Sequence, residues 1–239
     1  MTDGNGTKVT ATVTVTIYGA NDAAVLTKAA EASVVKLAPG VTPTDLAPGE
    51  TEFISENRGL TQALLWTGRF AEASADKVRA TMLPERLSIL ATPEALDLTD
   101  SDRDWLYTID PALERARLTS HVARRFGLLG LAHPGTGLLT GPEPIDDPWI
   151  RGYRRLARMP GNERRVRAWL RDYDAGTITV KTSAGVVQPD ALQKSLRGKG
   201  DRPAVVFVLR LGSSVEAIIT EPPKSRDRST GSSIHPDRR

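Results

Sequence analysis

The stretch YRRLARMPGNERRVRAWLRDYDAGTITVKT, residues 153–182, decides the fold of the C-terminal half of this 239-residue chain. It opens with a strand-like run that stops at a Pro-Gly pair. Asn162 then has the character of a helix N-cap. The next eleven residues place apolar side chains on one helical face: Val166, Trp169, Leu170 and Tyr173. We expect Gly176 to end this helix, and a second strand over 177–181 follows.

The residues after this stretch continue the alternation of strand and helix. Pro189 stands at the start of a second helix, and 204–211 and 215–220 flank a Gly-Ser-Ser turn as in a β-hairpin. From 222 to 239 the chain is basic and holds almost nothing apolar, which is typical of a disordered tail. The pattern predicts a compact β-α-β-α-β-β domain followed by that tail.

The residues before this domain are mostly strand-like. Short apolar runs bounded by turn residues occur at 33–38, 52–55, 62–66, 78–83 and 86–90. Residues 91–104 are acidic and turn-rich, which indicates a domain boundary. Asp110 and Pro111 are suited to the N-cap and first turn of one helix that runs to about Phe126. The expected fold class is therefore α/β of the α+β type.

The N-terminus has a pattern of its own. Residues 9–17 alternate threonine with apolar side chains in a strict period of two, between two Gly-containing turns. This alternation predicts a half-buried strand. Because a single strand cannot form a sheet, we expect it to dock on the residues that follow.

Composition excludes several classes of function. The absence of Cys rules out disulfides, thiol catalysis and Cys-based zinc sites. The three His residues lack metal-ligand spacing, so we expect no metal. No apolar run approaches the roughly 20 residues of a membrane span, and no signal-peptide pattern follows Met1. We therefore expect a cytoplasmic protein without a membrane partner.

Charge divides the chain into an acidic and a basic half. Residues 1–150 hold 13 Lys or Arg against 20 Asp or Glu, whereas 151–239 hold 19 against 9. Eight Arg lie between 151 and 171 with one acid, Glu163. Such a cluster is either a solvated helix face or a surface for the phosphates of RNA. The candidate RNA-binding residues are Arg154, Arg155, Arg158, Arg164, Arg165, Arg167, Arg171, Lys181, Arg197 and Lys199.

Aromatic and titratable residues give weaker signals. Tyr153 lies among the arginines and is the one candidate for stacking on an unpaired base. Trp169 and Tyr173 share the apolar helix face, so we expect them in the core. Asp146 and Asp147 precede a proline and indicate a turn, and no nucleophile motif is present. We therefore name no catalytic residue.

Several short motifs follow one another in a defined order between residues 33 and 220. They are VVKLAPG (34–40), FISE (53–56), ALLWTG (63–68), RATMLP (79–84), Tyr107, DPA (110–112), ITVK (178–181), PDAL (189–192), LRGKG (196–200) and LR (209–210). Their order and spacing resemble the C-terminal portion of a bacterial family of class I S-adenosylmethionine-dependent methyltransferases that ends in a THUMP-like domain.

This resemblance implies a domain division and a partner. It implies the C-terminal remnant of a Rossmann-like, doubly wound methyltransferase sheet over 27–100 and a THUMP-like domain over 101–221. THUMP domains are associated with RNA, with tRNA and rRNA as the two candidate classes. The turn over 182–185 is less basic than is typical of the family, which weakens the RNA prediction at that turn.

The resemblance also bears on the cofactor. S-adenosylmethionine serves the full-length family, but its first four strands and Gly-rich cofactor loop have no counterpart in this sequence. We therefore expect this chain to lack the cofactor-binding half, to hold no cofactor and to be inactive alone. Whether it is part of an enzyme stays open.

Residues 3–25, which end in TVTVTIYGANDAAV, resemble the last strand of a VCBS or cadherin-like repeat of bacterial surface adhesins. The resemblance implies that 1–26 is a fused segment. Three hypotheses therefore remain. The chain is the RNA-binding part of a methyltransferase, a stand-alone RNA-binding module, or a fragment of a secreted adhesin.

Overall fold

A computed structural model describes most of the chain. Its described residues are 32–36, 49–68, 71, 76–131, 136–182 and 186–223. The strand expected over 9–17 and the tail beyond 223 lie outside these residues. The chain divides into two compact units. The N-terminal unit runs to Asp97 and includes Ile109–Phe126; the C-terminal unit comprises Leu98–Thr108 and the residues from Gly127 onward. Ile109–Phe126, which we had assigned to the C-terminal domain, groups with the N-terminal unit.

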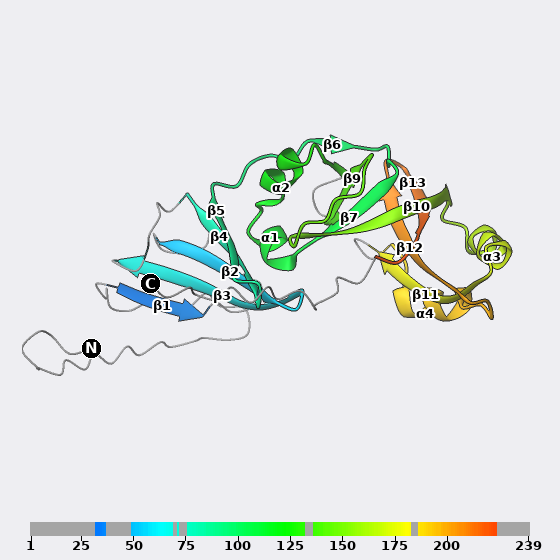
Figure 1. The fold of residues 1–239 in the computed structure, drawn as a ribbon, viewed down its shortest axis with the longest axis horizontal. Coiled ribbons are helices and arrows are strands. Elements are labelled where there is room, and N and C mark those ends of the chain that lie inside the picture. The colour runs from blue at the N-terminus through cyan, green and yellow to red at the C-terminus, as the bar shows by residue number, and fades with distance from the viewer. Residues whose placement is uncertain are drawn as a thin grey trace, which may run out of the picture. The chain divides into compact units, whose positions relative to one another are not determined.

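The N-terminal unit contains a five-stranded sheet in the order β1-β3-β2-β4-β5 (Figure 1). Its strands are β1 (Ala32–Lys36), β2 (Glu50–Glu56), β3 (Gly59–Gly68), β4 (Val78–Leu83) and β5 (Leu87–Ala91). β2 and β4 run parallel, whereas the other neighbouring pairs are antiparallel. The strands expected in this part of the chain are confirmed, with small shifts of their ends.

The single helix predicted from Asp110 onward is two short helices, so its predicted length is wrong. α1 (Pro111–Arg115) begins as expected, because the Asp110 carboxylate accepts a hydrogen bond from the Ala112 backbone N–H at 3.0 Å. Arg117 then adopts a φ of 58°, which interrupts the helical backbone. α2 (Thr119–Arg125) starts two residues later.

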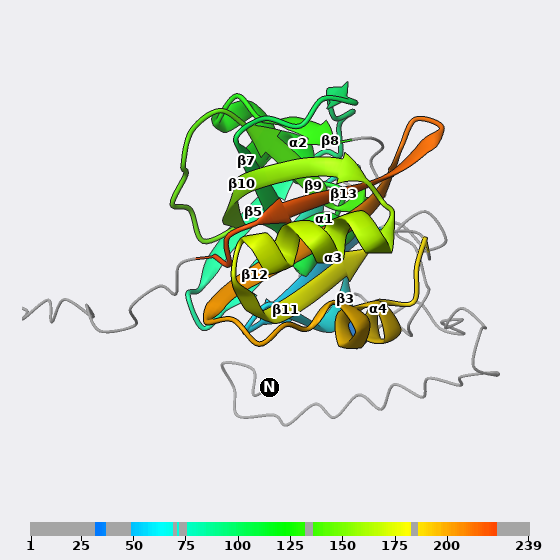
Figure 2. The same ribbon diagram turned by 90° about the vertical axis from the view of Figure 1, so that its right-hand side faces the viewer.

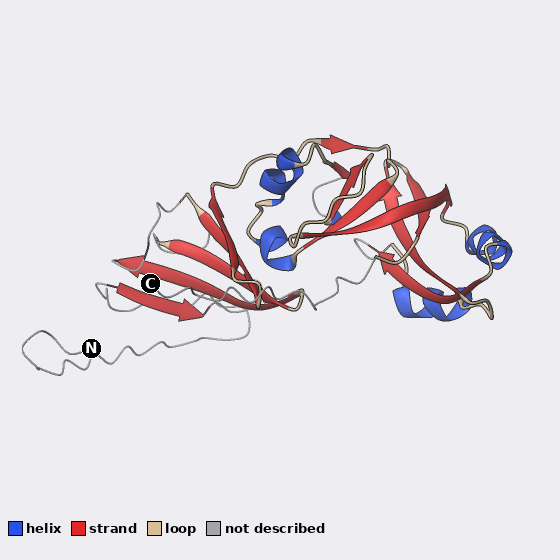
Figure 3. Cartoon of the chain, in the orientation of Figure 1, coloured by secondary structure: helices blue, strands red, loops and turns tan. Residues whose placement is uncertain are grey.

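The C-terminal unit is built on an eight-stranded sheet in the order β11-β12-β13-β10-β7-β9-β8-β6 (Figures 1 and 3). Its strands are β6 (Leu98–Thr99), β7 (Trp105–Ile109), β8 (Leu129–Leu131), β9 (Leu138–Gly141), β10 (Ile150–Pro160), β11 (Ala175–Thr182), β12 (Arg202–Leu211) and β13 (Ser214–Thr220). α3 (Glu163–Asp172) joins β10 to β11, and α4 (Pro189–Leu196) joins β11 to β12 (Figure 2). The predicted β-α-β-α-β-β order is confirmed, and the fold class is α+β.

Both faces of this sheet carry a core. On one face α3 and α4 pack through Val166, Leu170, Ile178, Val180, Leu196, Val206, Val208 and Ile219. The other face buries Leu106, Leu131, Leu138, Tyr153, Val205, Phe207, Leu209, Leu211 and Ile218. Neighbouring residues of β12 alternate between the two cores, which explains why its sequence is a continuous apolar run.

A side chain accepts a hydrogen bond from one backbone N–H of the edge strand β11. β11 stands at one end of the strand order and pairs in parallel with β12. The Val180 backbone N–H donates a hydrogen bond to Oε1 of Gln193 at 3.1 Å. Gln193 belongs to α4, so this helix both covers the sheet and caps its edge strand.

The turn between α3 and β11 differs from the expected glycine stop. α3 ends at Asp172, and the left-handed residue is Asp174, with a φ of 62°. Gly176 already belongs to β11, so its prediction as a helix stop is wrong. A Cβ at this position would lie 1.7 Å from the carbonyl oxygen of Gly200. Glycine is needed here because a second backbone comes close.

Replacing Leu170 by Ala should lower the free energy of unfolding by about 2–5 kcal/mol, because truncation leaves a cavity between α3 and the sheet. Leu170 is 2% exposed, whereas Leu98 of the same unit is 45% exposed and provides the control. Leu98→Ala should change stability by less than about 0.5 kcal/mol. Urea unfolding followed by tryptophan fluorescence measures both. Equal effects would contradict the packing of α3.

Candidate nucleic-acid interface

α3 presents its arginines to solvent because its opposite side is anchored. The Asn162 side chain caps the helix by accepting from the backbone N–H groups of Arg164 and Arg165, at 3.0 and 3.3 Å. Val166 and Leu170 are buried. Trp169 and Tyr173 stack on each other, with ring centroids 5.1 Å apart, and pack against the same core. The predicted inward face is therefore confirmed.

The four arginines of α3 are all exposed, but they differ in their partners. Arg167 pairs with Glu163 one turn earlier, and its Nε donates to the Ser195 carbonyl at 3.1 Å. Arg171 lies 3.7 Å from the Asp172 carboxylate. Such exposed pairs are weak and yield readily to another anion. Within the described ranges, the side chains of Arg164 and Arg165 contact no carboxylate.

A second set of cations follows α4. Arg197 and Lys199 are exposed. The backbone N–H of Gly198 between them donates to the carbonyl of Gly176 at 3.2 Å, which brings this segment beside the start of β11. We define the basic face as Arg164, Arg167, Arg171, Arg197 and Lys199, with Arg165 at its margin.

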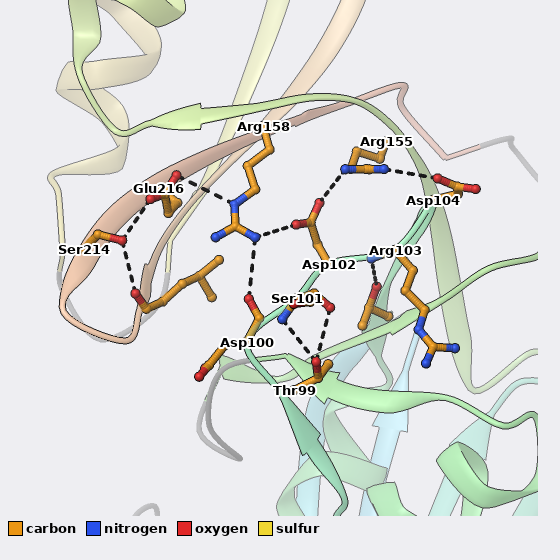
Figure 4. Close-up of polar contacts among 12 residues, drawn as sticks. Thr99, Asp100, Ser101, Asp102, Arg103, Asp104, Arg155, Arg158, Ser214 and Glu216 are labelled. Carbon is orange, nitrogen blue, oxygen red and sulfur yellow. Dashed lines mark hydrogen bonds and ion pairs between the residues drawn. The ribbon is translucent and has the colours of Figure 1, made fainter.

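The arginines of β10 have a different environment, created by an irregularity in the strand. The register of β10 against β13 shifts between Arg155 and Ala157. Regular alternation would place Arg155 and Arg158 on opposite faces of the sheet, but the bulge puts both on the same face. There both arginines reach the carboxylate of Asp102 (Figure 4).

These contacts occupy both guanidinium groups. Asp102, whose side chain is 2% exposed, lies 2.7 Å from Nη1 of Arg158 and 3.3 Å from Nη1 of Arg155. Arg155 also bonds Asp104 at 3.1 Å, and Arg158 lies 3.7 Å from Glu216 (Figure 4). The network ties the segment before β7 to β10 and β13. We call this network of Asp102, Asp104, Glu216, Arg155 and Arg158 the clasp. Its carboxylates neutralise both guanidinium groups within the fold.

The remaining candidates are also separate from the basic face. Arg154 is exposed but lies 3.5 Å from Glu221. Lys181 lies on the sheet face opposite α3, since its partner in β12 is Phe207, and its Nζ is 6.0 Å from the ring centroid of Tyr153. Tyr153 is only 2% exposed and packs edge-to-face on Phe207. Its prediction as a base-stacking residue is therefore wrong.

Thus six of the ten predicted residues belong to the basic face or its margin, and Arg154, Arg155, Arg158 and Lys181 do not. Sequence reasoning missed Asp102 as the partner of two arginines more than fifty positions away. The acids at 100, 102 and 104 were the available signal. Nothing in the local pattern of β10 marks the bulge that brings Arg155 and Arg158 together.

Tyr107 and Asp147, two titratable residues outside the basic face, make local contacts within the fold. Burial raises the pKa of Tyr107 to about 12, and its hydroxyl donates to the carbonyl of Glu143. The Asp147 carboxylate caps its turn by accepting from the Trp149 N–H at 2.9 Å. No group of three or more acids and histidines that could hold a metal occurs in this part of the chain. The described helices also include none that is long and apolar enough to cross a membrane.

The C-terminal unit is similar to a known domain family. The model of the THUMP domain-like family matches residues 150–222, which comprise the elements from β10 to β13. The C-terminal unit therefore contains a THUMP-like domain, as the sequence motifs had indicated.

The longer similarity is to methyltransferases. The chain is 30% identical over 198 residues to uncharacterised S-adenosylmethionine-dependent methyltransferases of Mycobacterium tuberculosis strains CDC 1551 and H37Rv. These alignments cover 78% of this chain and 52% of each relative, so the chain spans about half the length of the curated relatives it matches. The chain is thus similar over most of its length to S-adenosylmethionine-dependent methyltransferases, and its residues 150–222 match the THUMP domain-like family.

A solved structure shares the fold. A Porphyromonas gingivalis W83 protein assigned as a methyltransferase superposes with a TM-score of 0.62 at 15% identity. The match covers 81% of this chain and 51% of the other. The likeness therefore extends over most of the fold seen here.

Asp102→Asn should destabilise the C-terminal unit by about 1–3 kcal/mol, because it removes a buried charge that faces two guanidinium groups. Asp104→Asn is the matched control. Asp104 also pairs with Arg155, but its side chain is 72% exposed against 2% for Asp102. We expect less than about 0.5 kcal/mol for this variant. Thermal unfolding measures both, and equal midpoints would refute the clasp.

Proposed function

We propose that this chain is the RNA-binding part of a methyltransferase-related protein, and that its basic face holds the phosphates of RNA. The main observation that supports this proposal is that the arginines of β10 and those of α3 have different partners. Arg155 and Arg158 of β10 are neutralised by the buried carboxylate of Asp102, whereas the arginines on α3 and after α4 are exposed with weak partners or none in the described structure. The THUMP-like match supports RNA as the polyanion.

Electrostatic repulsion among its cations favours the binding of an anion at the basic face. Several cations of one sign on a single face repel one another, and the fold gains nothing from that repulsion. Phosphates placed there would convert the repulsion into attraction and release condensed counterions. Arginine is suited to this role, since its planar guanidinium can donate two parallel hydrogen bonds to one phosphate.

The residues described do not fit S-adenosylmethionine. Binding this cofactor at a class I sheet requires a Gly-rich turn between a strand and a helix, where backbone can approach the ligand. The Gly-x-Gly sequence at 198–200 leads into strand β12. At Gly198 and Gly200 the close approach is made by the chain's own backbone. We therefore derive no methyl-transfer step for this chain.

Within this proposal the chain supplies RNA capture, and tRNA and rRNA are the classes to test first. Both are abundant in the cytoplasm, where we expect the protein to act. A stand-alone RNA-binding module would use the same basic face, so the two hypotheses differ only in whether methyl transfer accompanies binding.

Replacing Arg164, Arg167 and Arg171 together by Gln should weaken RNA binding and lower the log–log salt slope by about 2, at about 0.7 per lost phosphate contact. Anisotropy with a fluorescein-labelled RNA hairpin at several salt concentrations measures both quantities. Replacing Arg86, Arg103 and Arg117 by Gln removes the same charge outside the basic face and should leave the slope unchanged. If both triple variants behave alike, general charge and not this face holds the RNA.

The purified chain should transfer no methyl group, because none of its described glycine turns can receive the methyl donor. Incubation with tritiated S-adenosylmethionine and bulk tRNA or rRNA should give label in RNA equal to a blank without protein. Incorporation above that blank would contradict the proposal that this chain contributes binding only.

A further inference from the structure

The segment Arg197–Asp201, which leads from α4 into β12, is held against the turn that leads from α3 into β11. Two of its backbone N–H groups donate to the first residues of β11, and the N–H of Arg202, the first residue of β12, donates to the turn. Gly198 donates to Gly176 at 3.2 Å, Gly200 to Ala175 at 3.3 Å, and Arg202 to Asp174 at 3.1 Å. The segment therefore follows its neighbour along its whole length and is not a free loop.

Glycine is what permits this contact. A Cβ on Gly198 would lie 2.0 Å from the Ala175 carbonyl oxygen, and one on Gly200 would lie 2.1 Å from the Asp174 carbonyl oxygen. Gly176 faces Gly200 with a corresponding distance of 1.7 Å. At each of these glycines the nearest atom met is a backbone oxygen, which cannot rotate away as a side chain would. Any larger residue at these positions must displace the segment.

Arg197 and Lys199 alternate with these glycines, and both are exposed. Asp201 is the nearest acid along the chain and Asp174 lies in the facing turn, yet in the described structure neither forms an ion pair with them. The carbonyl of Ser195, two residues before Arg197, accepts the Nε of Arg167. The glycine contacts thus fix the backbone that carries Arg197 and Lys199, and Arg167 contacts the chain just before this segment.

We infer that Arg197 and Lys199 form a preorganised clamp for phosphates of the RNA backbone. This inference rests on the proposed function. A cation carried by an immobile backbone loses less conformational freedom on binding than one carried by a mobile loop, so it contributes more affinity. The guanidinium of Arg197 and the compact ammonium of Lys199 would contact neighbouring phosphates, as their different geometries suit.

The double variant Arg197→Gln, Lys199→Gln tests the clamp. Its affinity for the fluorescein-labelled RNA hairpin should fall about tenfold at about 0.1 M salt, and its log–log salt slope by about 1.4. Arg86→Gln with Arg117→Gln is the charge-matched control and should bind like the wild type. Both residues of the control are exposed and belong to the N-terminal unit.

The outcomes separate this inference from the proposed function. Wild-type protein that binds no RNA would refute the proposed function and the clamp with it. If the wild type binds, the α3 triple variant weakens binding and the Arg197, Lys199 variant does not, then the clamp alone is refuted.

Gly198→Ala tests the rigid placement without changing charge. RNA affinity should fall about threefold to tenfold, because the segment must move away from Ala175. Gly59→Ala is the control, since its Cβ would come no nearer than 3.5 Å to another atom. Circular dichroism verifies that both variants fold. A folded Gly198→Ala variant with wild-type affinity overturns the preorganised clamp; if that variant does not fold, the Arg197, Lys199 variant decides.

Discussion

Burial of β12 on both of its faces is the constraint on which the C-terminal unit depends. Val206 and Val208 pack under α3 and α4, whereas Val205 and Phe207 pack into the opposite core. Because β12 lies between β11 and β13, the same strand also sets the register of its neighbours. A one-residue slip would exchange the two cores and turn α3 off the sheet. The orientation of the basic face is thus a consequence of apolar packing beneath it.

Sequence reasoning recovered what depends on neighbouring residues. The N-cap at Asn162 and the apolar face of α3 are local patterns, so both were predicted and confirmed. The break at Arg117 was not, because a positive φ at an arginine has no sequence signature. The role of Gly176 was also missed, since it depends on Gly200, a residue brought close only by the folded chain.

The candidate site shows the same limit more sharply. The sequence placed the arginines of β10 and α3 in one cluster. The fold gives them different surroundings. A bulge in β10 turns Arg155 and Arg158 toward Asp102, where they stabilise the domain. Three residues of sequence separate Arg158 from Asn162, and beyond Asn162 the arginines of α3 face solvent. Local charge density therefore predicted where cations occur and not which of them are available.

The amide of Gln193 has a consequence beyond the single chain. A parallel edge strand exposes backbone donors that a strand of another molecule can pair with, which is a route to self-association and fibre growth. By accepting the hydrogen bond of the Val180 N–H, Gln193 occupies one such donor in the middle of β11. This contact therefore leaves one donor fewer at the edge of β11 for a strand of another molecule to pair with.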